Sequence, residues 1–312
     1  MKVTIIGGCG AVGSATAFRI AQDGQVSEIV LVDLLRNLAE AHALDIEQAV
    51  VHRATTRVRA GEMEDTMDSD VIILAAGVFR RPIEISRRDY LAENLPLIIN
   101  AVSPLVARSP SALWMVATVP VDPLVYLIHR AFLIPRQKII GLNRNDTSRF
   151  RWAIARTLSV QSTAIEAFVL GEHGETQVPL FSRIRIDGRA VSLDPEQIKT
   201  VQEEMAGFYA RWNRLQPGRT AGWTSAESIG DITASIVSED GKLWTCSTCL
   251  EGEYGLKEVS LGVPIRLHSG KVKEIIEFDL DPGERMALKA SAVSIQEMIK
   301  EGENLLRTNK KI

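Results

Sequence analysis

A histidine between two glycines is the first residue whose type and setting suggest chemistry. His173 lies in the stretch Leu170-Gly171-Glu172-His173-Gly174-Glu175, directly after an apolar run. Hydrophobic cores rarely hold a histidine flanked in this way, so His173 is either a proton-transfer group or a solvated loop residue. Histidine is the side chain best suited to exchange a proton near neutral pH. The sequence therefore makes His173 a candidate general acid or base, with the loop residue as the alternative.

A carboxylate and a guanidinium follow each other at helical spacing. Asp146 and Arg149 lie in the stretch 145–151, which has the pattern of a helix start. Residues three apart share one helix face. The planar donors of arginine match a carboxylate with two parallel hydrogen bonds. We expect Asp146 to orient His173 and Arg149 to bind a substrate carboxylate; the alternative is an N-cap aspartate with a surface salt bridge.

Two further stretches follow the ends of predicted strands. Residues 78–89 contain four arginines and a proline, directly after a strand that ends at Gly77. Such a loop suits an anionic substrate, although it could also be solvated or contact another subunit. Residues 117–123 end the strand that would pass beneath a nicotinamide, and the simple alternative is an ordinary connection from strand to helix.

The elements that must position these residues begin with a glycine-rich turn. Residues 3–13 run from a β-branched strand into a helix and contain the pattern G-x-G-x-x-G at Gly8, Gly10 and Gly13. The first glycine permits a tight turn, the second lets backbone N–H groups approach a pyrophosphate, and the third allows close helix packing. A second strand ends in Asp33, twenty residues after Gly13, where an acid can bind ribose hydroxyls and repel a 2′-phosphate. The pattern predicts an NAD site, with NAD preferred over NADP.

The first half of the chain alternates strands with helices. Near-continuously apolar strands in such an alternation indicate a parallel sheet that is covered on both faces, a Rossmann-type doubly wound α/β fold. Ligands bind at the carboxyl ends of such strands. The predicted strands are 2–7, 28–32, 70–77, 112–119 and 138–141, with short extended pieces near 55–60, and the predicted helices are 11–23, 35–52, 90–107 and one from 121.

The second half has the mixed pattern of an α+β domain. Proline at the first helical position predicts helices that begin at Pro195 and Pro282. The helix that begins at Pro195 carries an apolar stripe, which we interpret as a core-facing surface. A subunit contact is the alternative. The predicted strands are 164–170, a hairpin over 183–192, 242–250, 258–267 and 271–278. We therefore expect a dinucleotide-binding domain over 1–142 and a catalytic domain over 143–312, packed directly together.

Composition and charge exclude several classes of protein. The chain of 312 residues is 46% hydrophobic and 24% charged, with a net charge of −3, which is ordinary for a globular protein and offers no basic face for nucleic acid. The most apolar stretch, 112–128, is interrupted by Pro120, Asp122 and Pro123, so no membrane span is expected. Because Met1 and Lys2 lead directly into a strand, we expect no targeting segment and a cytoplasmic protein.

The three cysteines do not predict a metal site. Cys246 and Cys249 form a C-x-x-C pattern, but on a strand residues three apart face opposite sides, and no second pair completes a zinc site. Our first interpretation of Cys9 is a small residue that the phosphate turn tolerates. The alternative is a redox-sensitive position, because a helix N-terminus can lower the pKa of a thiol.

Taken together, these motifs resemble the lactate/malate dehydrogenase family, in the family's order and over essentially the whole chain. The Gly-Glu-His-Gly form is more similar to the lactate dehydrogenase-like branch than to the mitochondrial malate branch. The motifs that carry the resemblance are Gly8/Gly10/Gly13 with Asp33, Arg87-x-Asp89…Asn94, Asp146…Arg149, Gly171-Glu172-His173-Gly174 and Gly222-Trp223-Thr224-Ser225.

The resemblance implies hydride transfer between NAD and a small anionic 2-hydroxy or 2-oxo acid, with malate and oxaloacetate as the first choice. His173 would take the hydroxyl proton, and Asp146 would stabilise the imidazolium. Arg149 would hold the substrate carboxylate, and Arg87 would polarise the carbonyl oxygen from a closing loop. Arg80 would select the substrate, because in this family arginine at its position accompanies malate enzymes and glutamine accompanies lactate enzymes.

The resemblance also implies the remaining site residues and the assembly. Thr224 and Val119 would line the substrate pocket, and the family mostly forms homodimers or homotetramers. The residues that would contact NAD are Gly8, Gly10, Ala11, Val12, Gly13, Asp33, Gly77, Asn94, Thr118 and Val119.

The chain departs from the family around the substrate. Val119 replaces an asparagine and cannot offer an amide, which Asn143 or Asn145 could supply instead. The arginine-containing loop is one residue longer than usual. Counting back from the aspartate and asparagine that follow selects Arg87 as the polarising arginine, with Arg88 as the alternative.

Other activities compete with malate oxidation. Another anionic 2-hydroxy acid or L-lactate is the nearest alternative, and a catalytically silent NAD-binding protein is a third. An NAD-dependent glycosidase would be expected to have a longer chain and a Cys/His metal site, and the sequence offers neither.

Overall fold

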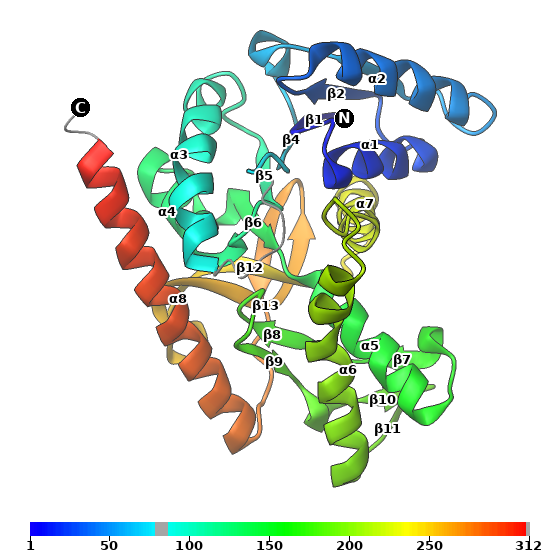
Figure 1. Ribbon diagram of the computed structural model, residues 1–312, viewed down its shortest axis with the longest axis vertical. Coiled ribbons are helices and arrows are strands. Elements are labelled where there is room, and N and C mark those ends of the chain that lie inside the picture. Colours follow the sequence, from blue (N-terminus) through cyan, green and yellow to red (C-terminus); the bar gives the residue numbers. More distant parts are fainter. Residues whose placement is uncertain (79–86, 310–312) are drawn as a thin grey trace.

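The first half of the protein is built on a parallel sheet, as predicted. The computed structural model describes residues 1–78 and 87–309. The parallel strands lie in the order β3-β2-β1-β4-β5-β6, which is the order of a doubly wound dinucleotide-binding fold (Figure 1). The strands are β1 Lys2–Ile6, β2 Glu28–Val32, β3 Arg57–Ala60, β4 Val71–Leu74, β5 Leu113–Val116 and β6 Ile139–Leu142.

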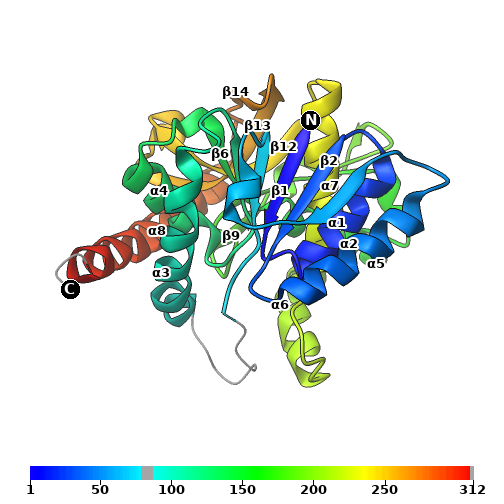
Figure 2. The ribbon, with the colours of Figure 1, turned by 90° about the horizontal axis from the view of Figure 1, so that it is seen from above.

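Helices cover both faces of this sheet. In Figure 2, α1 and α2 lie on one side of the strands, and α3 and α4 lie on the other. Their apolar faces pack on strands whose side chains are almost all buried, and these buried side chains belong to one continuous core. The helices are α1 Ala11–Asp23, α2 Arg36–Val50, α3 Arg87–Val106 and α4 Val121–Phe132.

The second half continues the same sheet with antiparallel strands. Strand β12 pairs with β6, where Cys246 lies opposite Leu142, and β13 pairs with β12 along nearly its whole length. The two halves therefore share a sheet as well as packing side by side. The added strands are β12 Leu243–Glu251, β13 Lys257–His268, β14 Lys271–Ile275, β8 Val169–Gly171 and β9 Gln177–Pro179.

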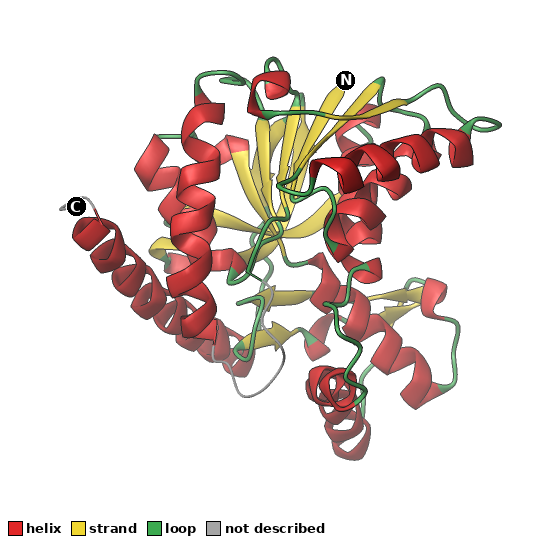
Figure 3. Ribbon diagram, turned by 45° about the horizontal axis from the view of Figure 1, so that its top comes forward, coloured by secondary structure: helices red, strands yellow, loops and turns green. Residues whose placement is uncertain are grey.

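One predicted strand is wrong. The run 164–170 forms two strands in different sheets, separated by Ala167 and Phe168, which are both buried and belong to neither strand. Strand β7 (Ile165–Glu166) joins a small sheet with β10 (Arg185–Ile186) and β11 (Arg189–Ala190), which Figure 3 shows apart from the main sheet. Strand β8 pairs with β13 in the main sheet, and Glu172 and His173, which follow it, are buried.

Four helices complete the second half, and the sequence analysis missed one of them. Helix α7 lies where only the Gly222–Ser225 motif had been noted, and it packs against α1. A β-carbon on Gly222 would lie 2.2 Å from the Ala11 carbonyl oxygen, so glycine permits this close approach. The helices are α5 Arg144–Leu158, α6 Pro195–Arg214, α7 Trp223–Ser238 and α8 Pro282–Asn309.

Other predictions in the second half agree with the structure. The hairpin turns at Asp187 and Gly188, and both helices that begin with proline form. Cys246 and Cys249 are buried free thiols on β12. Within the described ranges, no helix combines the length and apolar character that crossing a membrane would require.

Candidate active site

His173 and Asp146 meet at the junction of the two halves. His173 lies two residues beyond β8 and is 5% exposed, and Asp146 lies in the first turn of α5 and is 3% exposed. Nδ1 of His173 is 2.6 Å from Oδ2 of Asp146. The structure thus brings together two residues that are 27 positions apart, in the arrangement expected of a base and its orienting carboxylate.

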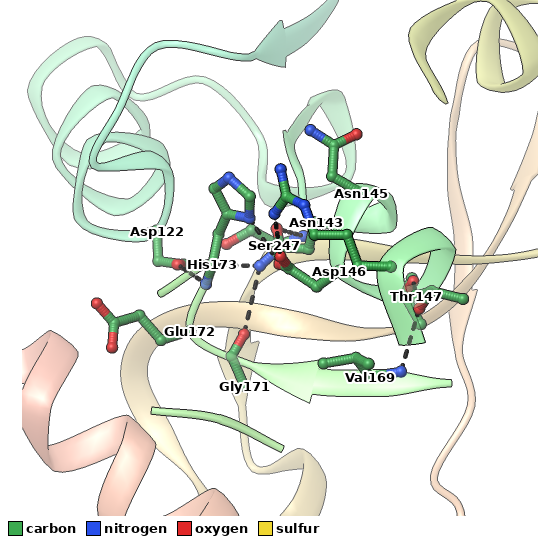
Figure 4. A network of polar contacts seen from close by, with 12 residues as sticks. Asp122, Asn143, Asn145, Asp146, Thr147, Val169, Gly171, Glu172, His173 and Ser247 are labelled. Atoms are coloured by element: carbon green, nitrogen blue, oxygen red, sulfur yellow. Dashed lines mark hydrogen bonds and ion pairs between the residues drawn. The ribbon is translucent and has the colours of Figure 1, made fainter. Parts of the chain in front are cut away.

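The start of α5 is fixed against the strands that carry His173. Thr147 Oγ1 accepts the backbone N–H of Val169 on β8 at 3.1 Å and lies 3.0 Å from Thr245 Oγ1 on β12. Figure 4 shows the Thr147–Val169 bond beside the His173 turn. These buried contacts set the distance between the Asp146 carboxylate and the imidazole.

Arg149 extends this cluster along the same face of α5. Its Nη1 donates to Asp146 Oδ1 at 2.9 Å, so Asp146 bridges the arginine and the histidine. The guanidinium carbon lies 4.7 Å from the centre of the Phe208 ring of α6, a cation–π distance. The guanidinium is therefore held by a carboxylate at one edge and by an aromatic ring on one face, close to the catalytic pair.

Sequence reasoning missed a second carboxylate in this network. Asp122, at the start of α4, is 1% exposed, and its Oδ2 accepts the backbone N–H of His173 at 2.7 Å. Its Oδ1 accepts the side-chain amide of Asn143 at 3.1 Å. Within residues 117–123, roles had been predicted only for Thr118 and Val119, and Asp122 had been noted only as an interruption of the apolar stretch. The available signal was a single acid inside a long apolar stretch, because a buried carboxylate requires partners.

The two asparagines proposed to replace the missing amide at Val119 differ in their contacts. Both ends of the Asn143 amide already have protein partners, since the side chain donates to Asp122 and to the Gly171 carbonyl and accepts the Ser247 N–H. Asn145 donates to Ser225 Oγ at 2.9 Å, while its buried Oδ1 has no hydrogen-bond partner among the described residues. Asn145 is therefore the one of the two with an acceptor to offer.

The Asn145–Ser225 bond also places the predicted pocket residue Thr224. Thr224 is the second residue of α7, next to Ser225 and two residues after the glycine that contacts Ala11. The start of α7 therefore touches both the glycine-rich turn and the start of α5. Thr224 lies on the same first turn of α7 as Ser225, and its role in the substrate pocket stays a prediction.

The glycine-rich turn is closely packed against its own strand and helix. A β-carbon on Gly13 would lie 2.1 Å from the Gly7 carbonyl oxygen, and one on Gly8 would lie 2.9 Å from the Leu31 β-carbon. At Gly10 the nearest atom would be 3.4 Å away. Gly8 and Gly13 thus serve the packing of the turn itself, whereas a β-carbon on Gly10 would make only an ordinary van der Waals contact with the protein at the start of α1, where Ala11 and Val12 follow.

The strand ends next to this turn are tied together by side chains. Asn94 of α3 accepts the Val78 N–H through Oδ1 and donates through Nδ2 to the Val119 carbonyl, both at 2.7 Å. Thr118 Oγ1 donates to the Ala76 carbonyl at 2.6 Å, and a β-carbon on Gly77 would lie 3.4 Å from Asn94 Oδ1. The predicted cofactor residues after β4 and β5 therefore form one cluster.

The two arginines predicted to close over the substrate are not part of this geometry. Arg80 lies outside the described residues. Arg87 is the first residue of α3, and its side chain, like that of Arg88, also lies outside the described part of the structure.

Two family models match nearly the whole chain. The lactate/malate dehydrogenase NAD-binding domain matches residues 1–141, and the lactate/malate dehydrogenase α/β C-terminal domain matches residues 144–306. The chain belongs to the lactate/malate dehydrogenase family. Membership makes it an NAD-dependent oxidoreductase that acts on a CH–OH group, and it confirms the family resemblance seen in the motifs.

Individual relatives and solved structures agree over the full length. A malate dehydrogenase from Chlorobium phaeovibrioides is 33% identical, over 96% of this chain and 98% of the relative. An L-lactate dehydrogenase 2 from Lactiplantibacillus plantarum is 32% identical, over 96% and 97%. The structure of malate dehydrogenase from Salinibacter ruber superposes with a TM-score of 0.90 at 31% identity, over 99% of this chain and all of that one. The fold predicted from the sequence is thereby confirmed.

The start of α1 fits the NAD that the family binds. This helix has Gly10 at its N-cap position without a side-chain cap, and no acidic residue lies in its first turn. Its first backbone N–H groups are therefore available to a pyrophosphate, and the helix dipole favours the negative charge. The family match confirms NAD as the cofactor, and the individual residues predicted to contact it stay predictions.

Asp33 and Cys9 face each other at the edge of this site. Asp33 accepts the Cys9 N–H at 2.9 Å through Oδ2 and the Leu35 N–H at 3.1 Å through Oδ1. Burial, followed by the charge of Asp33, raises the pKa of the Cys9 thiol to about 11. A raised pKa favours the protonated thiol at neutral pH, which supports the interpretation of Cys9 as a small residue in the turn.

Metal chemistry has no support in the described residues, where no group of three or more His, Cys, Asp or Glu side chains could hold an ion. The polar groups that converge on the site are the imidazole, carboxylates, guanidinium and amides already described. These groups can bind an anionic acid and move a proton at an oxygen atom.

Proposed function

We propose that this protein catalyses the reversible NAD-dependent oxidation of (S)-malate to oxaloacetate. The observation that carries the proposal is the contact chain from Arg149 through Asp146 to His173, next to the NAD-binding half. It combines a carboxylate-binding group with a base whose orientation is fixed. The full-length relatives named malate dehydrogenase support the choice of malate.

His173 performs the proton transfer. Its Nδ1–H donates to Asp146, which leaves Nε2 to accept the hydroxyl proton of the substrate. The Asp146 carboxylate then stabilises the imidazolium that forms. Bound NAD supplies the hydride acceptor. In the reverse direction the imidazolium returns its proton to the oxygen of the 2-oxo acid.

Three arginines provide the electrostatic part of the mechanism. Arg149 binds the carboxylate next to the reacting carbon, Arg87 polarises the reacting oxygen, and Arg80 binds the distal carboxylate of malate. The assignments of Arg80 and Arg87 are supported by the motifs in the sequence. A desolvated guanidinium at Arg80 would remain unpaired beside the methyl group of lactate, and an unpaired buried polar group costs about 1–3 kcal/mol or more.

A panel of 2-oxo acids, followed by the loss of NADH absorbance, tests the proposal. We expect kcat/KM for oxaloacetate to exceed that for pyruvate by about 100-fold or more. The variant Arg80→Gln should lower the oxaloacetate value and raise the pyruvate value, while His173→Asn should lose activity on both. Equal turnover of pyruvate and oxaloacetate by the wild type would overturn the malate assignment.

Two observations keep other substrates in the panel. The relative named L-lactate dehydrogenase is as similar as the malate enzymes, so lactate is the second candidate. Val119 offers no side-chain hydrogen bond, which favours testing other anionic 2-hydroxy acids, including sulfonated ones. NADH binding without turnover of any member would instead indicate a catalytically silent protein.

We also propose that the protein is a homodimer or homotetramer. Helix α2 and the residues that flank it carry five exposed apolar side chains: Leu34, Leu35, Leu38, Leu44 and Val51. Association with a second copy of the chain would remove such side chains from water. Sedimentation equilibrium should give a mass at least twice that of the 34.3 kDa chain.

A further inference from the structure

His173 is held at two points by two carboxylates from different helices. Asp146 of α5 contacts Nδ1 of the ring at 2.6 Å, and Asp122 of α4 accepts the backbone N–H at 2.7 Å. Figure 4 shows the Asp122 carboxylate at the backbone of His173 and Asp146 beside the ring. The contact at Nδ1 fixes the rotation of the imidazole. The contact at the backbone N–H fixes the position of the main chain that carries the side chain.

The turn that carries His173 needs such a contact. Gly171 has a φ of +84°, and Gly174 closes a tight turn by donating its N–H to the Glu172 carbonyl at 2.7 Å. A turn between two glycines has more backbone freedom than other segments. The N–H of His173 is buried with the rest of the residue, so without Asp122 it would be an unpaired buried donor.

Asp122 is itself held rigidly. Asn143 donates to its Oδ1 at 3.1 Å and accepts the Ser247 N–H of β12 at 2.9 Å. The hydroxyl of Ser260, on β13, donates to the backbone carbonyl of Asp122. Asp122 therefore links the backbone of His173 to strands β12 and β13 of the main sheet.

The charge of Asp122 also acts on His173. Burial raises the pKa of the Asp122 carboxyl to about 6, while the His173 N–H and the Asn143 amide favour its ionised form. Above this pH the group is an anion. His173 is the titratable group whose charge acts on it, and the groups facing it from α5, β12 and β13 are the neutral Asn143, Ser247 and Ser260. The anion thus lies against the residue that becomes positive during proton transfer.

We propose that Asp122 is a positioning residue for hydride transfer: it fixes His173 through the backbone N–H and, as an anion, favours the imidazolium. The inference rests on the proposed role of His173 as the proton acceptor. Asp122 touches neither the imidazole nitrogens nor, on this geometry, the reacting atoms, so it acts through His173.

The variant Asp122→Asn tests this inference. An amide has one acceptor oxygen, so either the His173 N–H or the Asn143 amide loses its acceptor, and the negative charge is removed. We expect kcat for oxaloacetate reduction to fall by about 10- to 100-fold, with NADH affinity unchanged. The pH above which reduction is lost should move lower by about half a unit or more.

A double variant tests whether the loss of activity comes from the lost hydrogen bond and charge or from a disturbed fold. In Asp122→Asn with Asn143→Asp, the new amide can donate to residue 143 while its oxygen accepts the His173 N–H, and the negative charge stays in the network. Residue 143 can still accept the Ser247 N–H, while its longer bond to the Gly171 carbonyl is lost. We expect kcat to return to within about tenfold of wild type, and the pH at which activity is lost to move back towards the wild-type value.

The role of Asp122 can also be tested by a measurement that does not depend on enzyme activity. The chain has five histidines, so ¹³Cε1 NMR of labelled histidine should show five signals, and His173→Asn identifies the signal of His173. Asp122→Asn should shift the midpoint of that titration to lower pH. If the wild type turns over no 2-oxo acid, the proposed function is wrong, while this titration still decides the role of Asp122.

Asp65→Asn is the matched control. The Asp65 carboxylate also accepts a backbone N–H, from Glu62 at 2.8 Å, but its own carbonyl binds Lys2 at the amino end of β1, opposite the cofactor edge. We expect this variant to keep the wild-type kcat and His173 titration. The inference is overturned if Asp122→Asn keeps kcat within about twofold, or if kcat, NADH affinity and melting temperature fall together while the His173 titration stays in place.

Discussion

Asp146 lies between His173 and Arg149 and contacts each through a different carboxylate oxygen, Oδ2 at 2.6 Å and Oδ1 at 2.9 Å. One side chain therefore orients both the base and the proposed carboxylate-binding group. Because a single helix turn carries Asp146 and Arg149, α5 sets the relative position of their backbones, and Phe208 of α6 also contacts the guanidinium. The position of His173 depends instead on how β8 meets the start of that helix.

Replacing Asp146 by asparagine should impair chemistry far more than binding. The amide preserves the shape, but it removes the charge that stabilises the imidazolium and permits the wrong tautomer of His173. We expect kcat to fall by on the order of 10²- to 10⁴-fold, with NADH affinity within about twofold of wild type. Steady-state kinetics and a fluorescence titration with NADH provide both values. A kcat within about threefold of wild type would remove Asp146 from the mechanism.

Replacing Arg149 by lysine should weaken substrate binding without affecting the cofactor. Lysine keeps the charge but loses the planar pair of donors, so kcat/KM for oxaloacetate should fall by about 10- to 100-fold. Phe208→Leu is the matched control, because it removes only the ring 4.7 Å from the guanidinium and should cost about fivefold or less. An equal loss in the two variants would mean that the α6 contact, and not the guanidinium fork, determines binding.

The sequence predicts the catalytic cluster well where chemistry follows local spacing. The proximity of Asp146 and Arg149 follows from the helix period, and the Gly8–Gly10–Gly13 turn follows from a strand that leads into a helix. Asp33 and Thr118 lie at strand ends, which parallel topology brings to one edge. These relationships need no knowledge of distant contacts.

The parts that were missed depend on contacts between distant segments. Asp122 and His173 are 51 positions apart, and their contact exists because the main sheet continues from β6 into β12 and β13. The split of 164–170 into two strands depends on the same arrangement. Helix α7 is rich in serine, threonine and glycine, which have a lower helix propensity than alanine, and its packing on α1 stabilises a helix that propensity alone does not predict.

Two glycines of the phosphate turn should respond differently to alanine. At Gly13 a β-carbon would lie 2.1 Å from the Gly7 carbonyl oxygen, so Gly13→Ala should lower the free energy of unfolding by about 1–3 kcal/mol or more. At Gly10 the φ is −67° and the nearest atom would be 3.4 Å away, so Gly10→Ala should stay within about 1 kcal/mol of wild type.

The same Gly10 variant should lose cofactor affinity, because its methyl group occupies the space that a pyrophosphate needs. We expect a dissociation constant for NADH about tenfold higher or more. Urea denaturation without cofactor and quenching of tryptophan fluorescence by NADH separate the two effects. Unchanged NADH affinity in Gly10→Ala would place the pyrophosphate elsewhere.

The buried Asp122 carboxyl should make stability depend on pH in a defined direction. Its pKa is raised from 3.8 to about 6 by burial, so between these values the folded protein holds a proton that the unfolded chain has released. The contribution of this group is therefore fully present below pH 4 and is lost as pH rises through 6. Between pH 5 and pH 8 the loss should be about 1 kcal/mol.

Asp122→Asn lacks this ionisation, so its free energy of unfolding should rise relative to wild type by about 1 kcal/mol between pH 5 and pH 8. Urea denaturation at the two pH values measures the difference. Asp65→Asn is again the control, because a backbone hydrogen bond from Glu62 lowers the pKa of Asp65 below its ordinary value. Asp65 is therefore ionised at both pH values in the folded and the unfolded protein, and its variant should show no change between them. A flat difference for Asp122→Asn would mean that Asp122 is already ionised at pH 5, and that the His173 N–H and the Asn143 amide stabilise its charge more than burial opposes it.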